Sequence, residues 1–305
     1  MTSASSNSQI AIIGSSSMVG SRFAQLWQNK TQLISADLSS TPSIDLTKKG
    51  SVQEFFNTYE FETAILFSAF TDVDQAELQR NDKNGSCWKI NVDGVRNVAK
   101  SCKEKKVKLI FISTDFVFDG QNGPYKEDDS AGPNMDQVSW YGISKLEGEK
   151  IVEELEDFII LRISYPYRAY FQGKEDFFKK SLSLYSENKL YPMFDDQTMT
   201  PTFIDDVAPA LQLLLESDRK GVFHLASPTP GTPYEIIKNL IKTFGGDPKV
   251  VEKGSIIEFL KNGDKTPRPV KGGLIVDKIE KLGFVPTSWK KGIEQIYIQS
   301  KGKLI

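Results

Sequence analysis

The chain has 305 residues, of which 39% are hydrophobic and 26% charged, and its formal net charge is −2. This composition is that of a globular protein, and the length allows one large domain or two smaller ones. The near-neutral charge offers no basic surface for nucleic acid, and no apolar run is long enough to cross a bilayer. We therefore expect a cytoplasmic protein that binds neither nucleic acids nor membranes.

The N-terminus and the metal-ligating residue types exclude two further classes. Residues 1–8 lack the basic start and apolar middle of a signal peptide, so we expect a disordered tail. Cys87 and Cys102 are 15 residues apart on a predicted helix. That separation is roughly 22 Å, too far for a disulfide, so we predict reduced thiols. The single histidine, His224, lies in an apolar strand pattern and is predicted to pack there, so no metal site is expected.

The first predicted strand, Gln9 to Ile13, leads through a loop of small residues into a helix that ends near Asn29. Gly14, Ser17 and Gly20 have the spacing of a G-x-x-G-x-x-G nucleotide loop, with Ser in the middle position. Small residues at such a turn let a phosphate approach the helix N-terminus, where free N–H groups attract anions. An ordinary tight strand–helix turn is the alternative interpretation.

The second predicted strand, Leu33 to Ala36, ends in Asp37. An acidic side chain there can accept hydrogen bonds from the adenosine ribose and would repel a 2′-phosphate. No Lys or Arg follows until Lys48, so the sequence favours NAD(H) as cofactor and leaves NADP(H) open. We predict that Asp45 faces the adenine and that Thr47 caps the next helix.

Strand and helix patterns then alternate along the chain. The strands are expected over Thr63 to Phe67, Val107 to Ile112 and Phe158 to Ile163, and the helices over Gly85 to Lys105 and from Tyr141 to about Glu156. This alternation predicts a Rossmann-type α/β fold, a doubly wound parallel sheet with helices on both faces. Such sheets bind ligands at the carboxyl ends of their strands.

After Ser164 the pattern is less regular. Helices are predicted around residues 175–186, 205–215 and 233–244, a turn at 190–197, a strand at 222–226, and finally a tail rich in Lys, Pro and Gly. We predict an NAD(P)-binding domain over residues 9–165, to which residues 203–227 return. Residues 166–202 and 228–305 would form a smaller C-terminal substrate-binding lobe.

Tyr141 and Lys145 are four residues apart and share one face of their predicted helix. At roughly 5 Å and an effective dielectric near 20, an ammonium stabilises a phenolate by about 3 kcal/mol, which would lower the pKa of Tyr141 by about two. Thr114, at the end of a predicted strand, would hold a carbonyl oxygen beside that phenol. A surface helix with a chance Tyr-x-x-x-Lys is the alternative.

Four motifs in the same order resemble those of the extended short-chain dehydrogenase/reductases, and within them the dTDP-4-dehydrorhamnose reductase family. They are F-T-D-V-D-Q-A-E at Phe70 to Glu77, S-T-D-F-V-F-D-G at Ser113 to Gly120, Y-G-I-S-K-L-E-G-E at Tyr141 to Glu149, and D-Q-T-M-T-P-T at Asp196 to Thr202. The resemblance covers about residues 10 to 285. It implies a nicotinamide cofactor and a nucleotide-sugar substrate.

The resemblance also implies roles for individual residues. The catalytic residues would be Thr114, Tyr141 and Lys145. The residues that contact the cofactor would be Gly14, Ser17, Met18, Val19, Gly20, Asp37, Asp45, Leu46, Ser68, Ala69, Phe70, Tyr141 and Lys145. The residues that contact the sugar nucleotide would be Thr114, Asp115, Phe116, Tyr165 and Gln197.

The chain departs from the family pattern at four places. Ser17 replaces a glycine, Leu66 stands where the family usually has Asn, and Tyr165 stands where relatives often have Trp. About three extra residues lie between Thr114 and Tyr141. These differences affect cofactor affinity and substrate choice rather than the catalytic residues.

The resemblance implies reduction of the 4-keto group of a nucleotide-linked 4-keto-6-deoxy sugar, with hydride from NADH or NADPH and a proton from Tyr141. Two alternatives stay open. One is a nucleotide-sugar epimerase or dehydratase on the same scaffold. The other is a regulatory binding module similar to the beta subunit of methionine adenosyltransferase. A homodimer is among the assemblies that the sequence leaves open.

Overall fold

A computed structural model describes residues 9–261 and 265–303 of the chain. The residues group into two compact units, and neither is one continuous segment. The first contains residues up to 117, 139–162 and 207–223, and the second contains residues 118–138, 163–206 and 224–305. The sequence-based boundaries placed 118–138 with the nucleotide fold. These residues instead group with the second unit, where the N–H groups of Gly123 and Tyr125 donate to the carbonyls of Lys271 and Gly273.

The five strands predicted in the alternating part of the chain and the strand predicted at residues 222–226 form one six-stranded sheet, in the order β2-β1-β3-β4-β5-β7. Its strands are β1 (Ile10–Ile13), β2 (Leu33–Ala36), β3 (Thr63–Leu66), β4 (Lys108–Thr114), β5 (Phe158–Ile163) and β7 (Gly221–Leu225). β1 pairs in parallel with β2 and β3, and β3 pairs in parallel with β4. Every residue of β1, β3 and β4 is buried, as expected for a sheet covered on both faces.

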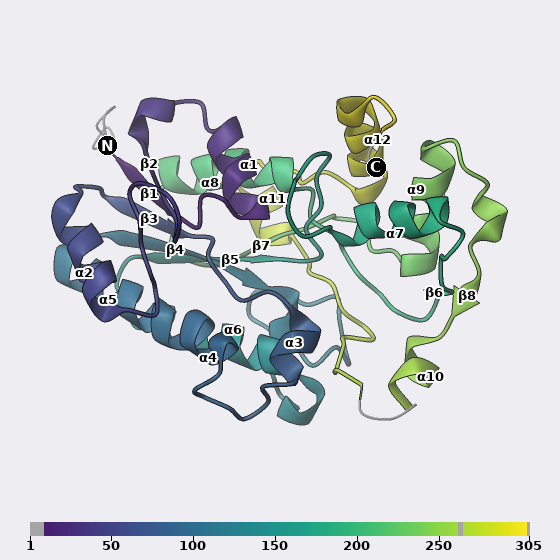
Figure 1. The fold of residues 1–305 in the computed structure, drawn as a ribbon, viewed down its shortest axis with the longest axis horizontal. Coiled ribbons are helices and arrows are strands. Elements are labelled where there is room, and N and C mark those ends of the chain that lie inside the picture. Colours follow the sequence, from purple (N-terminus) through teal and green to yellow (C-terminus); the bar gives the residue numbers. More distant parts are fainter. Residues whose placement is uncertain (1–8, 262–264, 304–305) are drawn as a thin grey trace. The chain divides into compact units, whose positions relative to one another are not determined.

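Helices cover both faces of this sheet (Figure 1), with α1 and α8 on one face and α2, α5 and α6 on the other. The helices of the first unit are α1 (Met18–Leu26), α2 (Lys49–Thr58), α3 (Val73–Glu77), α4 (Ser86–Trp88), α5 (Val95–Lys105), α6 (Trp140–Glu153) and α8 (Val207–Glu216). The strand order reverses between β1 and β3. Doubly wound sheets bind ligands at such a switch point, so we expect the site at the carboxyl ends of β1 and β3.

The predicted helix over residues 85–105 is interrupted. A π-helical segment, Lys89–Gly94, separates α4 from α5. Its member Asn91 is buried, although it lies on an otherwise apolar face with Val92 and Val95. π-helical turns are rare and are frequently found at functional sites, so Asn91 is a candidate for a role in the functional site.

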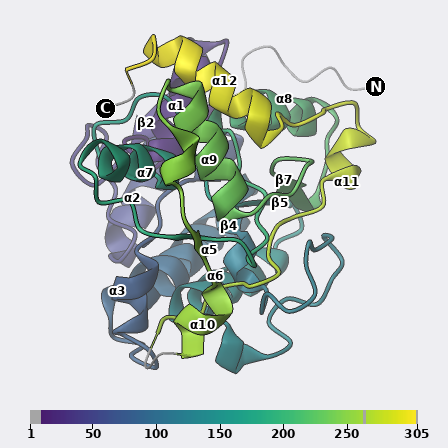
Figure 2. The same cartoon turned by 90° about the vertical axis from the view of Figure 1, so that its right-hand side faces the viewer.

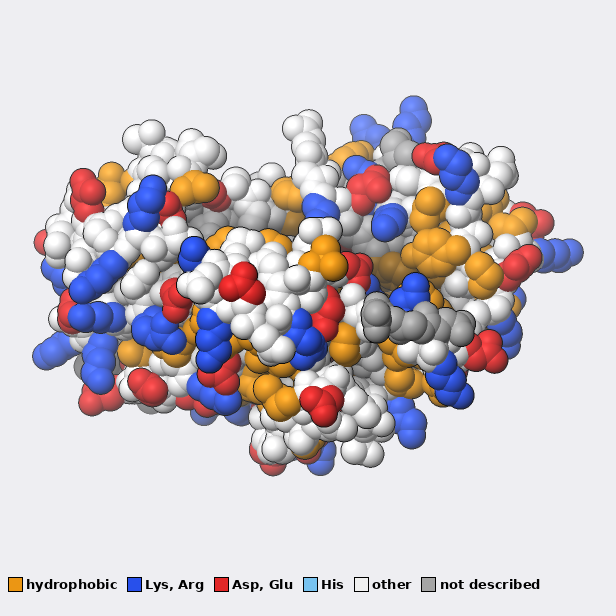
Figure 3. Space-filling view, turned by 60° about the horizontal axis from the view of Figure 1, so that its bottom comes forward, with side chains coloured by type: hydrophobic (Ala, Val, Ile, Leu, Met, Phe, Trp, Pro, Cys, Tyr) orange, Lys and Arg blue, Asp and Glu red, His pale blue; other side chains and the backbone are white. Residues whose placement is uncertain are grey.

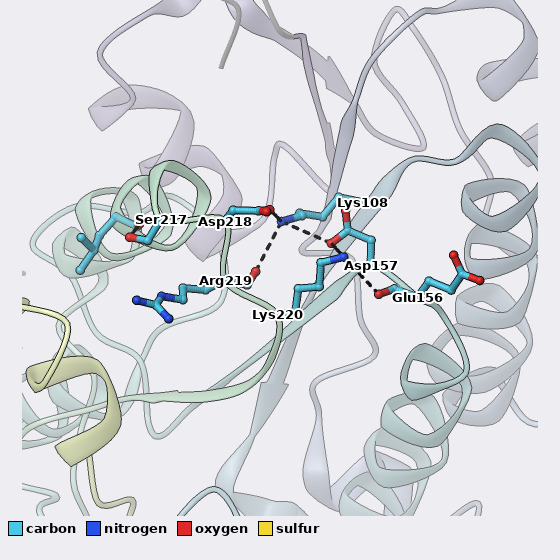
Figure 4. Close-up of polar contacts among 8 residues, drawn as sticks. Lys108, Glu156, Asp157, Ser217, Asp218, Arg219 and Lys220 are labelled. Carbon is cyan, nitrogen blue, oxygen red and sulfur yellow. Dashed lines mark hydrogen bonds and ion pairs between the residues drawn. The ribbon is translucent and has the colours of Figure 1, made fainter. Parts of the chain in front are cut away.

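A charged cluster joins the amino-terminal ends of β4 and β5 to the connection between α8 and β7 (Figure 4). The ammonium of Lys108 lies 3.3 Å from carboxylate oxygens of both Asp157 and Asp218 and 3.4 Å from the carbonyl oxygen of Arg219. Lys220 lies 3.5 Å from the same Asp157 oxygen. The cluster is at the opposite ends of these strands from Thr114, so we assign it to the fold and not to the site.

The second unit has its own core, built around Tyr167, Phe178, Ile237 and Trp289. Its helices are α7 (Phe177–Ser186), α9 (Pro233–Thr243), α10 (Ile256–Lys261), α11 (Asp277–Glu280) and α12 (Trp289–Ser300), and its short parallel strands are β6 (Met193–Phe194) and β8 (Lys253–Gly254). Figure 2 shows α9 and α12 packed together, and the rings of Phe244 and Tyr297 contact there with centroids 5.2 Å apart.

The prediction of a Lys-, Pro- and Gly-rich tail after residue 244 is wrong, because α10, α11 and α12 form there. Within α12, Trp289, Ile293 and Ile296 recur at helical spacing and are buried. The side chain of Ser288 caps the helix by accepting the N–H of Lys291. The signal was present in the sequence, but the neighbouring lysines and prolines masked it.

Several smaller predictions can be checked directly. Cys87 and Cys102 are both free and buried. His224 is a buried strand residue whose Nδ1 lies 3.1 Å from the carbonyl oxygen of Ile275, as the packed-strand interpretation requires. Acidic and basic side chains are intermingled on the face shown in Figure 3. Within residues 9–261 and 265–303, no helix is long and apolar enough to span a bilayer, and no cluster of His, Cys, Asp and Glu could hold a metal ion.

A buried ion pair ties α6 to β5. The guanidinium of Arg162 binds both carboxylate oxygens of Glu149, at 2.9 and 2.7 Å, and both side chains are nearly inaccessible to solvent. Removal of one partner of such a pair leaves an uncompensated buried charge, which costs about 3–5 kcal/mol.

We therefore expect Glu149→Gln to lower the free energy of unfolding, measured by urea denaturation, by that amount. Glu149→Leu combined with Arg162→Met should recover most of the loss. Glu147→Gln is the matched control, since it breaks the more exposed Glu147–Lys150 pair on the same helix and should cost about 0–1 kcal/mol. Equal losses in both single variants would contradict the assignment.

Candidate functional site

The loop between β1 and α1 has the geometry of a phosphate cradle. Gly14 has a φ of +90°, and a Cβ added there would lie 2.5 Å from the backbone nitrogen of Ser68. A Cβ on Gly20 would lie 2.4 Å from the carbonyl oxygen of Gly14. Only glycine fits both positions, so the loop turns tightly against Ser68 and leads directly into the N-terminus of α1. Met18 and Val19 form the first turn of α1 and are half-buried.

Ser17, which replaces the family's glycine, is the N-cap of α1. Its hydroxyl oxygen accepts the N–H of Gly20 at 3.1 Å. The extra side chain therefore folds back onto the helix, where it occupies one of the N–H groups that would otherwise be free for an anion.

Asp37 lies at the carboxyl end of β2, and its carboxylate is tied to the glycine loop. One of its oxygens accepts both the N–H and the hydroxyl of Ser16, at 2.9 and 2.5 Å, and the other accepts the N–H of Leu38 at 2.7 Å. The sequence did not predict this role of Ser16. Its only indication was that Ser16 is a small polar residue inside the glycine loop.

Asp45 and Leu46 lie beyond Asp37 in the chain. The carboxylate of Asp45 accepts the N–H and the hydroxyl of Thr47, and these hydrogen bonds lower its pKa. The prediction that Thr47 caps α2 is wrong, because the N-cap is Lys48 and makes no side-chain cap bond. Leu46 is buried, and its carbonyl oxygen accepts the side-chain amide of Asn97 at 2.8 Å.

Ser68, Ala69 and Phe70 leave β3 half-buried, and Asn91 holds this segment. The Asn91 amide accepts the N–H of Phe70 at 2.8 Å and donates to the carbonyl oxygen of Phe70 at 3.0 Å. It also donates to the hydroxyl of Ser144 at 2.9 Å, and Ser144 donates to the carbonyl oxygen of Tyr141. Asn91, missed in the sequence, therefore connects the segment after β3 to the helix that carries Tyr141.

Thr114 and Tyr141 meet at the carboxyl end of β4. Tyr141 is buried, and burial raises the pKa of its phenol, while a hydrogen bond with the Thr114 hydroxyl lowers it and the nearby Asp115 carboxylate raises it. The ring of Phe116 contacts the Tyr141 ring edge to face, with centroids 6.0 Å apart. Asp115 and Phe116 are both buried. The structure thus brings together the predicted proton donor and the hydroxyl predicted to assist it.

Lys145 contradicts the electrostatic prediction. Its ammonium donates to the carbonyl oxygen of Ile112 at 2.7 Å and lies 3.8 Å from the centre of the Phe111 ring. Burial lowers its pKa to about 7, opposed by the Glu149 carboxylate. The groups that set the pKa of Tyr141 do not include Lys145, and that pKa is raised, not lowered. The Lys145 ammonium is directed at a backbone carbonyl oxygen, so the prediction that it lowers the pKa of Tyr141 is wrong.

The remaining two candidates, Tyr165 and Gln197, belong to the second unit. The Gln197 amide donates to the carbonyl oxygen of Pro269 at 2.9 Å and lies 3.5 Å from the Tyr165 hydroxyl. Tyr165 is half-buried and contacts Phe177 edge to face. Its φ is +39°, and the next residue is proline. Aromatic residues rarely have positive φ, and a residue before proline is normally extended, so this backbone stores strain of about 1–3 kcal/mol.

Comparison with known proteins identifies the family. Residues 8–301 match the family described as the RmlD substrate binding domain. The chain belongs to this family. The predicted family and the Rossmann-type fold are therefore confirmed.

Individual relatives in the RmlD family align with this chain over most of their length. The probable low-salt glycan biosynthesis reductase Agl14 of Haloferax volcanii is 31% identical over 241 residues, which are 78% of this chain and 77% of that protein. The dTDP-4-dehydrorhamnose reductase of Aggregatibacter actinomycetemcomitans is 27% identical over 302 residues, 94% of this chain and 98% of that protein. The crystal structure of dTDP-4-dehydrorhamnose reductase from Bacillus anthracis str. Ames in complex with NADP matches with a TM-score of 0.83 and 26% identity, covering 96% of this chain and 99% of that one.

The low pKa of Lys145 predicts a pH-dependent stability. Between pH 7 and about 10.4 the unfolded state binds this proton and the folded state does not, so the wild type gains stability as the pH rises through that window. The free energy of unfolding of Lys145→Met, relative to wild type, should fall across the window by roughly 3–5 kcal/mol and stay constant below pH 7. Urea denaturation at pH 6, 7, 8, 9 and 10 measures it.

Lys150→Met, at an exposed position on the same helix, is the matched control. A relative stability that changes with pH to the same extent in both variants would show that Lys145 is not the group responsible.

Proposed function

We propose that this chain is an NAD(P)H-dependent reductase of the 4-keto group of a nucleotide-linked 4-keto-6-deoxy sugar. The observation that carries the proposal is the buried Tyr141 phenol, hydrogen-bonded to Thr114 at the carboxyl edge of the sheet. The family and the names of the relatives, dTDP-4-dehydrorhamnose reductases among them, support the same reaction.

The residues present fit a dinucleotide cofactor. A side chain at Gly14 or Gly20 would collide with the protein's own backbone, so the two glycines keep the loop tight at the N-terminus of α1, where free N–H groups attract anions. Gly14, Ser17, Met18, Val19 and Gly20 would hold the pyrophosphate. The adenosine end would contact Asp37, Asp45 and Leu46, and the nicotinamide end would contact Ser68, Ala69, Phe70, Tyr141 and Lys145. When bound, the reduced nicotinamide supplies a hydride.

Tyr141 acts as the general acid that protonates the oxygen of the former keto group. Its raised pKa keeps the phenol protonated at neutral pH, as reduction requires. After proton transfer, the hydrogen bond from Thr114 stabilises the phenolate. Before it, the same hydroxyl orients the keto oxygen.

Lys145 binds and orients instead of tuning Tyr141. Its amino group donates one N–H to the carbonyl oxygen of Ile112, and the remaining N–H groups would donate to the hydroxyls of the nicotinamide ribose. By the family resemblance, Asp115, Phe116, Tyr165 and Gln197 would contact the sugar nucleotide.

An epimerase or dehydratase on the same scaffold would use the same three catalytic residues, and a regulatory subunit would keep them without turnover. A steady fall in absorbance at 340 nm when a keto sugar is added to the enzyme and NADH excludes both. A panel of nucleotide-linked 4-keto sugars, each with NADH and with NADPH, is therefore the first experiment.

Removal of the Tyr141 hydroxyl tests the proton donor. General acid catalysis contributes about 10²–10⁴-fold, so Tyr141→Phe should lose that factor in kcat. Its dissociation constant for NADH, measured by cofactor fluorescence, should stay near the wild-type value. Tyr59→Phe, which removes a phenol at the C-terminal end of α2, outside the predicted site, is the control. Turnover of Tyr141→Phe at the wild-type rate would refute the role.

Asp37 tests the cofactor preference. Its carboxylate would repel the 2′-phosphate of NADPH, so we propose that NADH is preferred. Asp37→Asn keeps an acceptor for Ser16 and removes the charge. We expect it to lower the KM for NADPH at least about tenfold relative to the KM for NADH, equivalent to about 1.4 kcal/mol. Asp45→Asn should leave the ratio unchanged, and an unchanged ratio in Asp37→Asn would reject the proposal.

A further inference from the structure

The backbone conformation of Tyr165 is strained, and its own side chain does not account for that conformation. Its positive φ, directly before Pro166, is unfavourable for an aromatic residue. Such a conformation persists only when the surrounding structure holds it, and it is found most often at sites of function. The residues that hold this segment therefore bear on where the Tyr165 ring points.

Thr202 makes three of the hydrogen bonds that hold this segment. On one side of Tyr165, the hydroxyl oxygen of Thr202 accepts the N–H of Ser164 at 2.9 Å, and the N–H of Thr202 donates to the Ser164 carbonyl oxygen at 2.7 Å. On the other side, the carbonyl oxygen of Thr202 accepts the N–H of Tyr167 at 3.0 Å. One residue thus grips the chain immediately before and after the strained pair Tyr165–Pro166.

The Thr202 side chain is itself held in place. Thr202 is buried, and its hydroxyl donates onward to the carbonyl oxygen of Leu225 at 2.7 Å. The hydroxyl is therefore both donor and acceptor, so its orientation is fixed. Valine has the same shape as threonine but satisfies neither partner, which would leave the Ser164 N–H and the Leu225 carbonyl unpaired in the interior.

The segment that carries Thr202 also carries Gln197, whose amide reaches the Tyr165 hydroxyl. The two predicted substrate contacts of the second unit are thus fixed relative to each other through one stretch of chain, residues 197–202. We propose that Thr202 is a positioning residue for substrate recognition, which holds Tyr165 in its strained conformation so that its ring and hydroxyl face the sugar beside Gln197. The proposal rests on the function proposed above.

The primary test is steady-state kinetics with Thr202→Val. We expect the KM for the keto sugar to rise about tenfold, which corresponds to about 1.4 kcal/mol, while kcat and the dissociation constant for NADH change by less than about twofold. Thr202→Ser keeps the hydroxyl and should restore the wild-type KM.

Thr200→Val is the matched control. Thr200 is buried in the same segment, and its hydroxyl oxygen accepts a backbone N–H, that of Leu274, at 2.8 Å. The variant therefore loses a comparable buried hydrogen bond without touching Tyr165. A rise in KM of the same size in Thr200→Val would show that Thr202 acts only through general stability.

A double-mutant cycle tests whether Thr202 acts through the tyrosine. Tyr165→Gly removes the ring and tolerates a positive φ. In that background, Thr202→Val should raise the KM no further. A second, independent tenfold rise would overturn the proposal, because Thr202 would then act on the substrate by another route.

Amide hydrogen exchange decides the structural part without any substrate. Exchange at Ser164 and Tyr167 should be faster in Thr202→Val than in Thr200→Val or wild type. Equal protection from exchange in the wild type, Thr202→Val and Thr200→Val would show that the Thr202 hydroxyl does not hold this segment. If the wild type reduces no keto sugar in the panel, the proposed function fails. The positioning role then falls with it, while the exchange result still reports whether Thr202 holds the strained segment.

Discussion

The amide of Asn91 is the contact on which the geometry of the first unit most depends. It satisfies both backbone groups of Phe70 and the hydroxyl of Ser144, so one buried side chain fixes the segment after β3 against the helix that carries Tyr141. The π-helical turn supplies the local geometry in which a polar side chain leaves an apolar helix face. Because a buried polar group that loses its partner is costly, this contact has few tolerable substitutes.

Protonation states follow from the same burial. Tyr141 stays protonated and Lys145 loses much of its charge because water is excluded from both. The i, i+4 spacing of the two residues in the sequence suggested mutual attraction, but spacing does not reveal where a flexible lysine side chain points. A nearby carbonyl, that of Ile112, binds the ammonium instead.

The alternation of apolar strands and amphipathic helices was sufficient to predict the sheet, and β5 was predicted to the residue. That pattern is local, and so is the glycine spacing of the β1–α1 loop. Asn91 and Ser16 could not be found in this way, since Ser16 binds Asp37, 21 residues away, and Asn91 binds Phe70 and Ser144, 21 and 53 residues away. The strain at Tyr165 depends on Thr202, which lies farther along the chain. The helix α12 was missed for another reason, since the neighbouring lysines and prolines obscured the helical spacing of its buried positions.

The two units are interleaved along the chain, and this has a consequence for synthesis. The sheet of the first unit takes β5 and β7 from segments that follow long stretches of the second unit. While the protein emerges from the ribosome, β4 has a bare edge until β5 is made, and the sheet is complete only after most of the chain is available. An unpaired strand edge invites pairing with other chains. The nascent protein therefore has an unpaired strand edge from the synthesis of β4 until β7 is made, and neither unit is encoded by one continuous stretch of the gene.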